Sequence, residues 1–333
     1  MKIISNLCKV LILGTLLFMC ACDDDDNNNV IVPPTETIAQ FITNNDDYST
    51  LKAALDLTEL TSTLNGEEEF TVFAPKNTAF DTYFLEAGIA SIDDIDTPEE
   101  IADLKTLLLN HVVSGTNRTS SLNTGYINSL SAFNENTDEF LSMYLEVSNG
   151  IVAINGGAVG DTNGATVTEE DLPMSNGIVH IVDAIIQLPT IDTFVIIDPN
   201  LSSLLAAISA YPSFEYTTQL AGDGPFTLFA PDNNAFDLLF EGDELPNQIS
   251  DITEEDLSGI LNLHVVDGSN IRVEAFTEDP LTTSGGTLTV DPASNILSDG
   301  SDPVIESTIL STNIQASNGV LHIIDNVLLT STL

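Results

Sequence analysis

Residues 70–80 read FTVFAPKNTAF, and residues 226–236 read FTLFAPDNNAF. A second pair of strings follows in the same order, with SNGIVHIVD at residues 175–183 and SNGVLHIID at residues 317–325. Strings that recur in one order along a chain indicate two copies of the same domain. Any function proposed for this chain must therefore be one that a duplicated module can serve.

The correspondence extends beyond these strings. LLNHVVSG at residues 108–115 matches LNLHVVDG at residues 261–268. We place the first domain at residues 36–189 and the second at residues 190–333. The join, Gln187-Leu188-Pro189-Thr190, is short and has no Gly or Ser, which favours a semi-rigid pair over two freely moving domains.

Each copy combines helical and strand patterns. In the first copy, the apolar spacing predicts a helix over 36–57 that is interrupted around 44–47, and another helix over 99–109. Residues 70–73 are typical of a β-strand, and residues 118–172 have strand character with Gly and Asn turns. The sum predicts an α+β fold.

Two local features carry sharper predictions. Asn77, or its counterpart Asn233, is placed to cap the helix that follows the first strand. Asn176-Gly177 and Asn318-Gly319 predict two-residue hairpin turns in which both positions take positive φ. The segment 178–186 after the first of these turns reads as a strand buried on both faces.

The charge balance is strongly acidic. The chain has 7 basic and 51 acidic residues, a formal net charge of −44, and a sequence pI of about 4.1. Nucleic acid, anionic lipid headgroups and polyanionic glycans are repelled by such a surface. Hydrophobic residues make up 43% of the chain, which indicates folded domains with acidic surfaces rather than disorder.

The N-terminus predicts a targeting segment. A weakly basic start and the apolar run 10–19 are typical of a signal peptide, and the run is too short for a comfortable bilayer span. Ala21 before Cys22 resembles a bacterial lipobox, so we expect a signal peptide at 1–21, lipid attachment at Cys22 and an acidic flexible tether at 22–35. A plain secretory signal is the alternative. The aspartates after Cys22 resemble a surface-export signal of lipoproteins, although a solvated tether needs no such role.

This leader has two consequences. We expect the mature protein in the outer membrane, lipid-anchored and exposed on the cell surface, with periplasmic orientation left open. The three cysteines of the chain all lie in or beside the leader. Cleavage before Cys22 therefore excludes intradomain disulfides, a cysteine nucleophile and cysteine-ligated zinc from the folded part.

The ordered pattern TVFAPxNxAF, LLxxHVVxG and SNGxxHxxD resembles the fasciclin domain, twice over. The resemblance implies tandem domains, each a small β sandwich or wedge with several packed helices, and a role in extracellular adhesion. Animal fasciclin domains implicated in receptor binding carry Tyr beside the central His, where this chain has Asn110 and Leu263, so that ligand is not carried over. The motif residues to which we assign structural roles are Phe73, Pro75, Asn77, Phe80, His111, Gly177, His180, Asp183, Phe229, Pro231, Asn233, Phe236, His264, Gly319, His322 and Asp325.

The sequence gives little support for an enzyme. All four histidines lie inside the repeated motifs, where flanking Val and Ile indicate hydrogen-bonded scaffold residues. His180 and Asp183 are three apart on a strand, so they point to opposite faces and cannot form a base with its orienting carboxylate. Neither a GxSxG elbow nor a GxxxxGK[ST] loop is present. We expect no cofactor and no catalytic or zinc site, with weak calcium binding open at 93–94 or 251–256.

The favoured hypothesis is a non-enzymatic surface lipoprotein that mediates adhesion or binds an extracellular protein or glycan partner. The alternative is an accessory glycan-binding protein for nutrient capture, weakened because the chain has no Trp and only 6 Tyr. Tyr126, Tyr144, Tyr211 and Tyr216 are the candidate contacts for it. A hydrolase is the third class. Between the central His and the SNG string the first copy is longer by eleven residues, which we place within 118–160 as a specificity-bearing loop.

Overall fold

The two repeated strings of each copy become neighbouring parallel strands. The computed structural model describes residues 33–134, 138–157, 164–241, 246–301 and 304–330, and residues 34–333 form one compact unit. The expected signal peptide, Cys22 and almost all of the expected tether lie outside the described residues.

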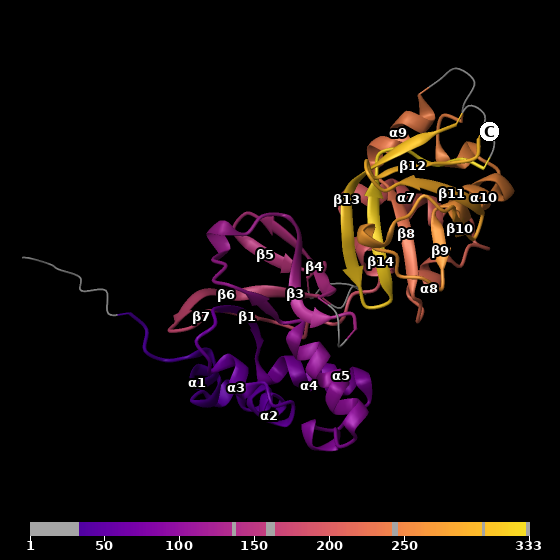
Figure 1. The fold of residues 1–333 in the computed structure, drawn as a ribbon. Helices are drawn as coiled ribbons and strands as arrows, with labels where there is room; N and C mark the ends of the chain where they lie inside the picture. The colour runs from indigo at the N-terminus through magenta and orange to yellow at the C-terminus, as the bar shows by residue number, and fades with distance from the viewer. Residues whose placement is uncertain (1–32, 135–137, 158–163, 242–245, 302–303, 331–333) are drawn as a thin grey trace, which may run out of the picture. The chain divides into compact units, whose positions relative to one another are not determined.

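The elements of copy 1 alternate helices and strands before an uninterrupted run of strands (Figure 1). Its helices are α1 Ile38–Thr43, α2 Ser49–Leu57, α3 Thr61–Leu64, α4 Asn77–Ala87 and α5 Pro98–Leu109, with 3-10 turns η1 Asp46–Tyr48, η2 Ile92–Asp94 and η3 Thr119–Ser121. Its strands are β1 Phe70–Pro75, β2 Val112–Ser114, β3 Gly125–Ala132, β4 Phe140–Ser148, β5 Ile151–Ile154, β6 Ala165–Met174 and β7 Gly177–Val182.

Copy 2 repeats this order. Its helices are α6 Ile191–Ile197, α7 Ser202–Ile208, α8 Tyr216–Leu220, α9 Asn233–Phe240 and α10 Glu254–Leu263, with η4 Pro199–Leu201, η5 Ile249–Asp251 and η6 Val273–Ala275. Its strands are β8 Phe226–Pro231, β9 Val265–Asp267, β10 Leu281–Thr283, β11 Gly286–Asp291, β12 Ile296–Ser298, β13 Glu306–Ala316 and β14 Gly319–Ile324. The α+β prediction is confirmed in both copies.

Each copy builds one sheet with its first long strand inside it. The order is β2-β1-β7-β6-β5-β4-β3 in copy 1 and β10-β11-β12-β13-β14-β8-β9 in copy 2. β1 runs parallel to β7 from the pair Phe70–Gly177 onward, and β8 runs parallel to β14 from the pair Phe226–Gly319 onward. The outer strands β2 and β3 also lie next to each other, so the sheet curls toward a barrel.

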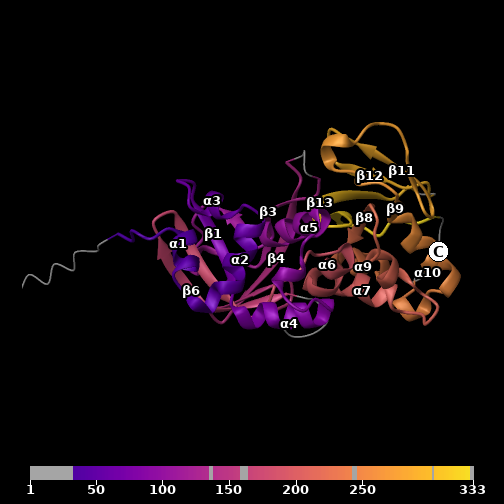
Figure 2. The same cartoon turned by 90° about the horizontal axis from the view of Figure 1, so that it is seen from below.

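Successive side chains of FTVFAP point to opposite faces of β1, so this one strand contributes to two hydrophobic cores. Phe70, Val72 and Ala74 face the core shared with the helices, whereas Phe73 faces a second core enclosed by the curled sheet. Figure 2 shows α6, α7, α9 and α10 gathered on one side of the strands of copy 2, the arrangement that this alternation requires. Phe80 and Phe236 are buried on the helix side in their respective copies.

Helix starts follow local sequence rules. Thr97 accepts from the Glu100 backbone N–H, the Glu100 carboxylate accepts from the Thr97 backbone N–H, and Pro98 occupies the first helical position of α5. The predicted interruption of the first helix is confirmed, because η1 separates α1 from α2. The predicted strand over 178–186 is shorter than expected and ends at Val182.

The prediction for the SNG turn is wrong in register. Met174 pairs with Gly177, so the two-residue loop is Ser175-Asn176, and of that pair neither residue has positive φ. Gly177 instead begins β7 with a φ of 140°, and a Cβ there would lie 1.9 Å from the Phe70 carbonyl oxygen. Glycine is needed for close approach to β1 rather than for the turn.

The turn asparagine has a role of its own. The Asn176 side chain accepts from the Ile38 N–H at the start of α1 and donates to the carbonyls of Leu64, the last residue of α3, and Gly66. Asn318 repeats this in copy 2 at the corresponding positions. One side chain therefore joins the last hairpin of each copy to its first helices.

Candidate functional site

The central histidine of copy 1 joins helix α5 to the segment after β7. His111 Nδ1 donates to the Leu107 carbonyl at 2.8 Å, and Nε2 accepts from the Ile186 N–H at 2.9 Å. Burial lowers the pKa of His111 to about 4. A neutral ring with both nitrogens committed to backbone groups acts as a crosslink and not as a general base.

His264 reproduces this crosslink. Its Nδ1 donates to the Ile260 carbonyl at 2.8 Å, and its Nε2 accepts from the Leu328 N–H at 3.1 Å. Burial lowers its pKa to about 4 as well. Both central histidines therefore make the same pair of backbone contacts in their respective copies.

The second histidine, His180 on β7, holds the loop after β2. Nε2 donates to the Asn117 carbonyl at 2.9 Å, and Nδ1 accepts from the Asp171 N–H at 3.1 Å. The ring stacks on Phe73 with centroids 5.5 Å apart. Burial lowers the pKa of His180, so the neutral ring bridges the β2–β3 loop to β6.

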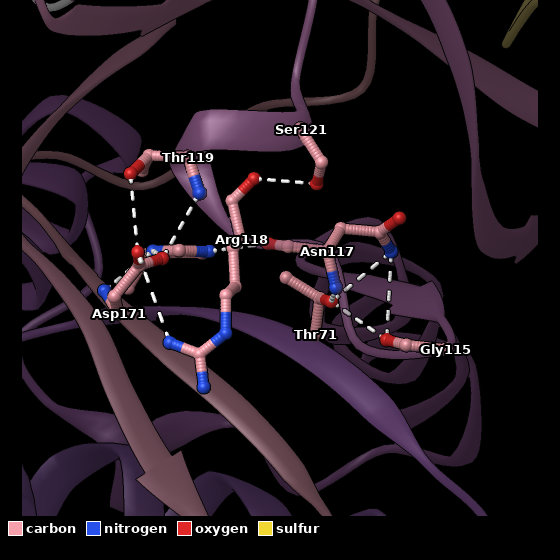
Figure 3. A network of polar contacts seen from close by, with 8 residues as sticks. Thr71, Gly115, Asn117, Arg118, Thr119, Ser121 and Asp171 are labelled. Atoms are coloured by element: carbon pink, nitrogen blue, oxygen red, sulfur yellow. Dashed lines mark hydrogen bonds and ion pairs between the residues drawn. The ribbon is translucent and has the colours of Figure 1, made fainter.

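Polar contacts fix this loop further, and Figure 3 shows them. Thr71 Oγ1 on β1 donates to the Gly115 carbonyl at 2.7 Å and accepts from the Asn117 N–H at 2.8 Å. The Asp171 carboxylate accepts from the Thr119 N–H at 2.9 Å and lies 4.0 Å from the Arg118 guanidinium. We call residues 115–121 the anchored loop; it presents Arg118, whose side chain is 53% exposed.

Copy 2 carries the same network with exchanged side chains. His322 Nε2 donates to the Ile271 carbonyl at 2.9 Å, and Thr227 accepts from the Ile271 N–H at 2.8 Å. Asn313 replaces Asp171, accepts from the Val273 N–H at 3.0 Å and donates to the Glu274 carboxylate. Asp171 and Asn313 have φ of 58° and 57°, the left-handed region that Asp and Asn tolerate better than other non-glycine residues. Burial lowers the pKa of His322 to about 4.

The predicted capping role of Asn77 and Asn233 is wrong. Asn77 lies inside α4, whose N-cap is Lys76, and its Oδ1 accepts from the Thr50 N–H in the first turn of α2 at 3.0 Å. In copy 2 the cap of α9 is Asp232, while Asn233 accepts from the Ser203 N–H of α7 at 2.9 Å. Each asparagine therefore caps a helix distant in sequence, which local patterning cannot predict.

The remaining motif residues have structural contacts. Asp183 accepts from the Thr166 N–H and Asp325 from the Thr308 N–H, each at 2.7 Å. Within the described residues, the Asp183 carboxylate makes no hydrogen bond or ion pair with His180. Pro75 ends β1 and Pro231 ends β8, and Phe229 stacks on His322 with centroids 5.6 Å apart.

The extra length of copy 1 forms strands instead of a turn-rich loop. It lengthens the hairpin of β3 and β4, whose counterparts β10 and β11 are shorter. β4 lies beside β13, where Ser142 Oγ accepts from the Gln315 N–H at 3.0 Å. Tyr126 donates to the buried Asp198 carboxylate at 2.9 Å and packs edge-on against Phe194. This part of the segment expected to bind partners contacts copy 2.

The candidate glycan contacts are buried or half-buried and pack against other residues of the protein. Tyr144 is 3% exposed and packs against Tyr126, and Tyr216 is 8% exposed. The Tyr211 hydroxyl donates to the Ile252 carbonyl. None of these rings forms an exposed stacking platform of the kind that sugar recognition uses.

A cleft that the sequence does not predict lies in copy 1 between the end of α4, η2, α5 and the join before copy 2. Its volume is about 650 Å³, within the range of ligand-binding pockets. Tyr83, Leu104, Leu107 and Leu188 contribute apolar walls. Its lining also includes the carboxylates of Asp94, Glu100 and Asp103, and among the described residues no Lys or Arg lines it. We call this the α4–α5 cleft.

Metal ligands and membrane spans can be assessed only for the described residues. There, no three or more His, Cys, Asp or Glu side chains gather as a metal-binding group. In the same part of the chain, no single helix is long and apolar enough to cross a bilayer. The bent pair Ile191–Ile197 and Pro199–Ile208 meets that test only jointly, and its largest apolar residues belong to the core of copy 2.

Comparison with known proteins matches both copies. The profile described as Fasciclin domain matches residues 46–189 and 199–330. The chain is 28% identical over 285 residues to transforming growth factor-beta-induced protein ig-h3 of Sus scrofa, covering 84% of this chain and 38% of that protein. It is 27% identical to human periostin, covering 82% of this chain and 30% of that protein. The chain thus spans less than half of these relatives.

Among solved structures, the chain is similar to the FAS1 domain pair of the insect cell adhesion molecule fasciclin I. The TM-score is 0.49 and the identity 16%, covering 84% of this chain and 97% of that one.

Proposed function

Because the chain belongs to the fasciclin family, with both copies matched, we propose that it is a non-enzymatic adhesion protein that binds an extracellular partner through tandem domains. Fasciclin domains are known for cell adhesion and extracellular interaction. The observation that carries the non-enzymatic part of the proposal is the fate of the histidines. All four are buried, and each uses both ring nitrogens in contacts with backbone groups.

The proposal includes lipid anchoring at Cys22 on the outer membrane, facing outward. Its support is the sequence alone: an apolar run, Ala21 before the cysteine, and an acidic tract after it. Cells producing the full chain should incorporate radiolabelled palmitate into it, and Cys22→Ala should abolish the label while Cys20→Ala retains it. Equal labelling of the two variants contradicts the assignment. Protease added to intact cells then tests surface exposure.

Adhesion is tested with the same cells. Cells that display the chain should adhere to surfaces coated with extracellular proteins or with other cells more strongly than cells carrying Cys22→Ala. Adhesion that is independent of the chain on every such surface contradicts the proposal. A glycan array tests the alternative of nutrient capture, which the burial and packing of the tyrosines make less favoured. Probing it with calcium and again with a chelator tests whether the weak calcium binding expected from the sequence contributes.

A further inference from the structure

The α4–α5 cleft combines an apolar interior with an acidic rim. Tyr83, Leu104 and Leu107 line it, and Leu104 and Leu107 belong to the buried core of copy 1, so these walls are held rigidly. Tyr83 packs beside Phe84 in α4. Partial burial and, to a lesser extent, the negative charge of the nearby Asp103 carboxylate raise the pKa of Tyr83.

The carboxylates on the rim keep acceptor capacity. Asp94 uses Oδ2 for the N–H groups of Ala90 and Ser91, both at 3.1 Å, and Glu100 uses Oε2 to cap α5. The other oxygen of each has no hydrogen bond within the described part of the chain. Asp103 is exposed and makes no ion pair or hydrogen bond there. Hydrogen bonds to ionised groups are the stronger ones, so these oxygens favour a cationic donor.

We propose that the α4–α5 cleft docks a short basic segment of a partner protein, in which Lys or Arg side chains flank an aromatic or aliphatic residue. The inference rests on the proposed partner-binding function and names the chemistry of the partner at one site. Lys and Arg stems pack on apolar walls while their charged ends reach carboxylates, and the Tyr83 ring adds a face for a cation. The net charge of −44 draws basic partners toward the molecule from a distance.

Charge and size select this occupant over others. An acidic or phosphorylated segment meets three carboxylates without a compensating cation in the lining. A volume of about 650 Å³ accommodates a few side chains, not a folded domain. A second copy of this chain is a poor occupant because its own surface is acidic, with only 7 Lys and Arg in all.

The absence of tryptophan provides a clean probe. The chain contains no Trp, so the fluorescence of a synthetic peptide in which lysines flank one tryptophan reports only the peptide. With the full chain in nonionic detergent, and detergent alone as the blank, we expect saturable binding that salt weakens. A peptide with glutamates in place of the lysines should not bind.

Variants locate the binding. Asp103→Asn breaks no described bond and should weaken binding about threefold, the range of an exposed ion pair. Ala90→Arg places a guanidinium at the mouth of the cleft and should weaken binding at least about tenfold through like-charge repulsion. Asp81→Asn, an exposed carboxylate on α4 outside the lining, is the matched control for the loss of one charge. Circular dichroism confirms that each variant is folded.

The outcomes separate the two proposals. Equal weakening by Asp81→Asn and Asp103→Asn, or unchanged binding by Ala90→Arg, overturns the cleft assignment because the attraction is then that of the whole acidic surface. Chain-dependent adhesion that Ala90→Arg leaves intact also overturns the cleft as the partner site, while the adhesive function stands. Cleft-dependent peptide binding by a chain that confers no adhesion supports the cleft and contradicts the proposed function.

Discussion

The two copies keep their histidine contacts identical and differ in what surrounds them. His180 and His322 accept from the backbone of a left-handed residue and donate to a loop carbonyl, although that residue is Asp171 in one copy and Asn313 in the other. By contrast, the hairpin of β3 and β4 is longer than that of β10 and β11. The comparison teaches that the repeated strings preserve the scaffold, whereas contacts with other surfaces vary between the copies.

The comparison is tested most severely at the two glycines that start β7 and β14. Gly177→Ala should lower the free energy of unfolding of copy 1 by at least about 4 kcal/mol, because the new Cβ meets the Phe70 carbonyl oxygen. Gly319→Ala should act equally on copy 2, where the obstacle is the Phe226 carbonyl oxygen. Urea denaturation followed by circular dichroism measures both.

A control separates crowding from backbone strain in this experiment. Gly115 has a φ of 79°, and a Cβ there has nothing within 4 Å. Gly115→Ala should therefore cost only about 1–2 kcal/mol, the penalty of the left-handed conformation. Equal losses for Gly115→Ala and Gly177→Ala would show that close strand approach does not set the requirement for glycine.

The histidines should make both copies sensitive to acid in the same pH range. His111, His264 and His322 have pKa values of about 4 when folded, and His180 has a lowered pKa, against about 6.5 in an unfolded chain. Between about pH 6.5 and 4 the unfolded chain therefore binds protons that the folded chain does not. The stabilising contribution of each of His111, His264 and His322 is fully present above about pH 6.5 and falls by about 1.4 kcal/mol per pH unit from there to about pH 4. His180 changes stability in the same direction.

Nuclear magnetic resonance measures this prediction directly. The ring signals of His111, His264 and His322 should remain constant from pH 8 to about pH 6, and the ring of His180 should titrate below the usual range of a histidine. The acidic surface has the opposite effect on global stability, since protonated carboxylates repel less, so the ring titration is the decisive readout. A ring in either copy that titrates near pH 6.5 contradicts the crosslink described for it.

The contact between the copies should depend on the hairpin that only copy 1 has at full length. Tyr126→Phe removes the donor to Asp198, which is 2% exposed, and should cost about 1–2 kcal/mol. It should also separate the unfolding of the two copies into two transitions. Tyr211→Phe is the matched control because that hydroxyl bonds within copy 2. The prediction is wrong if both variants retain a single transition of equal sharpness.

The smallest effect is expected from exchanging the left-handed residues. Asp171→Asn keeps an acceptor for Thr119 and should change stability by less than about 0.5 kcal/mol. Asn313→Asp places a carboxylate beside Glu274 and should cost up to about 1 kcal/mol, an amount that salt reduces. Melting curves at low and high salt distinguish the two. A larger loss for Asp171→Asn would mean that the pair with Arg118 contributes more than its exposure suggests.

The sequence predicted those features that depend on neighbouring residues. Duplication, the α+β class and the interrupted first helix follow from repeated strings and apolar spacing. The errors concern residues whose partners are distant in sequence. Asn77 is of a residue type that often caps the helix beginning beside it, but the helix that it caps is α2. Gly177 is of a residue type that favours turns, but its role is to allow the close approach of β1.

The cleft had no sequence signal for a related reason. Asp94, Glu100 and Asp103 are three of 51 acidic residues, and nothing local indicates that the three belong to one site. Only the folded arrangement of the end of α4, η2, α5 and the join places them in one cleft with Tyr83 and Leu188. The left-handed conformation of Asp171 also has no sequence signal, because it lies where the register of β6 shifts against β7, and that shift depends on the pairing of the two strands.

The parallel pairing of β1 with β7 and of β8 with β14 also affects the order in which the strands of each copy can pair during folding. The first long strand of each copy must wait for the last one, and Asn176 meets Ile38 across 138 positions of sequence. Contacts of that separation slow folding. FTVFAP and FTLFAP differ little, as do GIVHIV and GVLHII. Once the whole chain has left the ribosome, β1 and β8 therefore each have two nearly equivalent partners, β7 and β14. We expect synthesis from the N-terminus, which presents β7 long before β14, to favour the correct pairing of β1, and refolding of the whole chain from denaturant to lose that advantage.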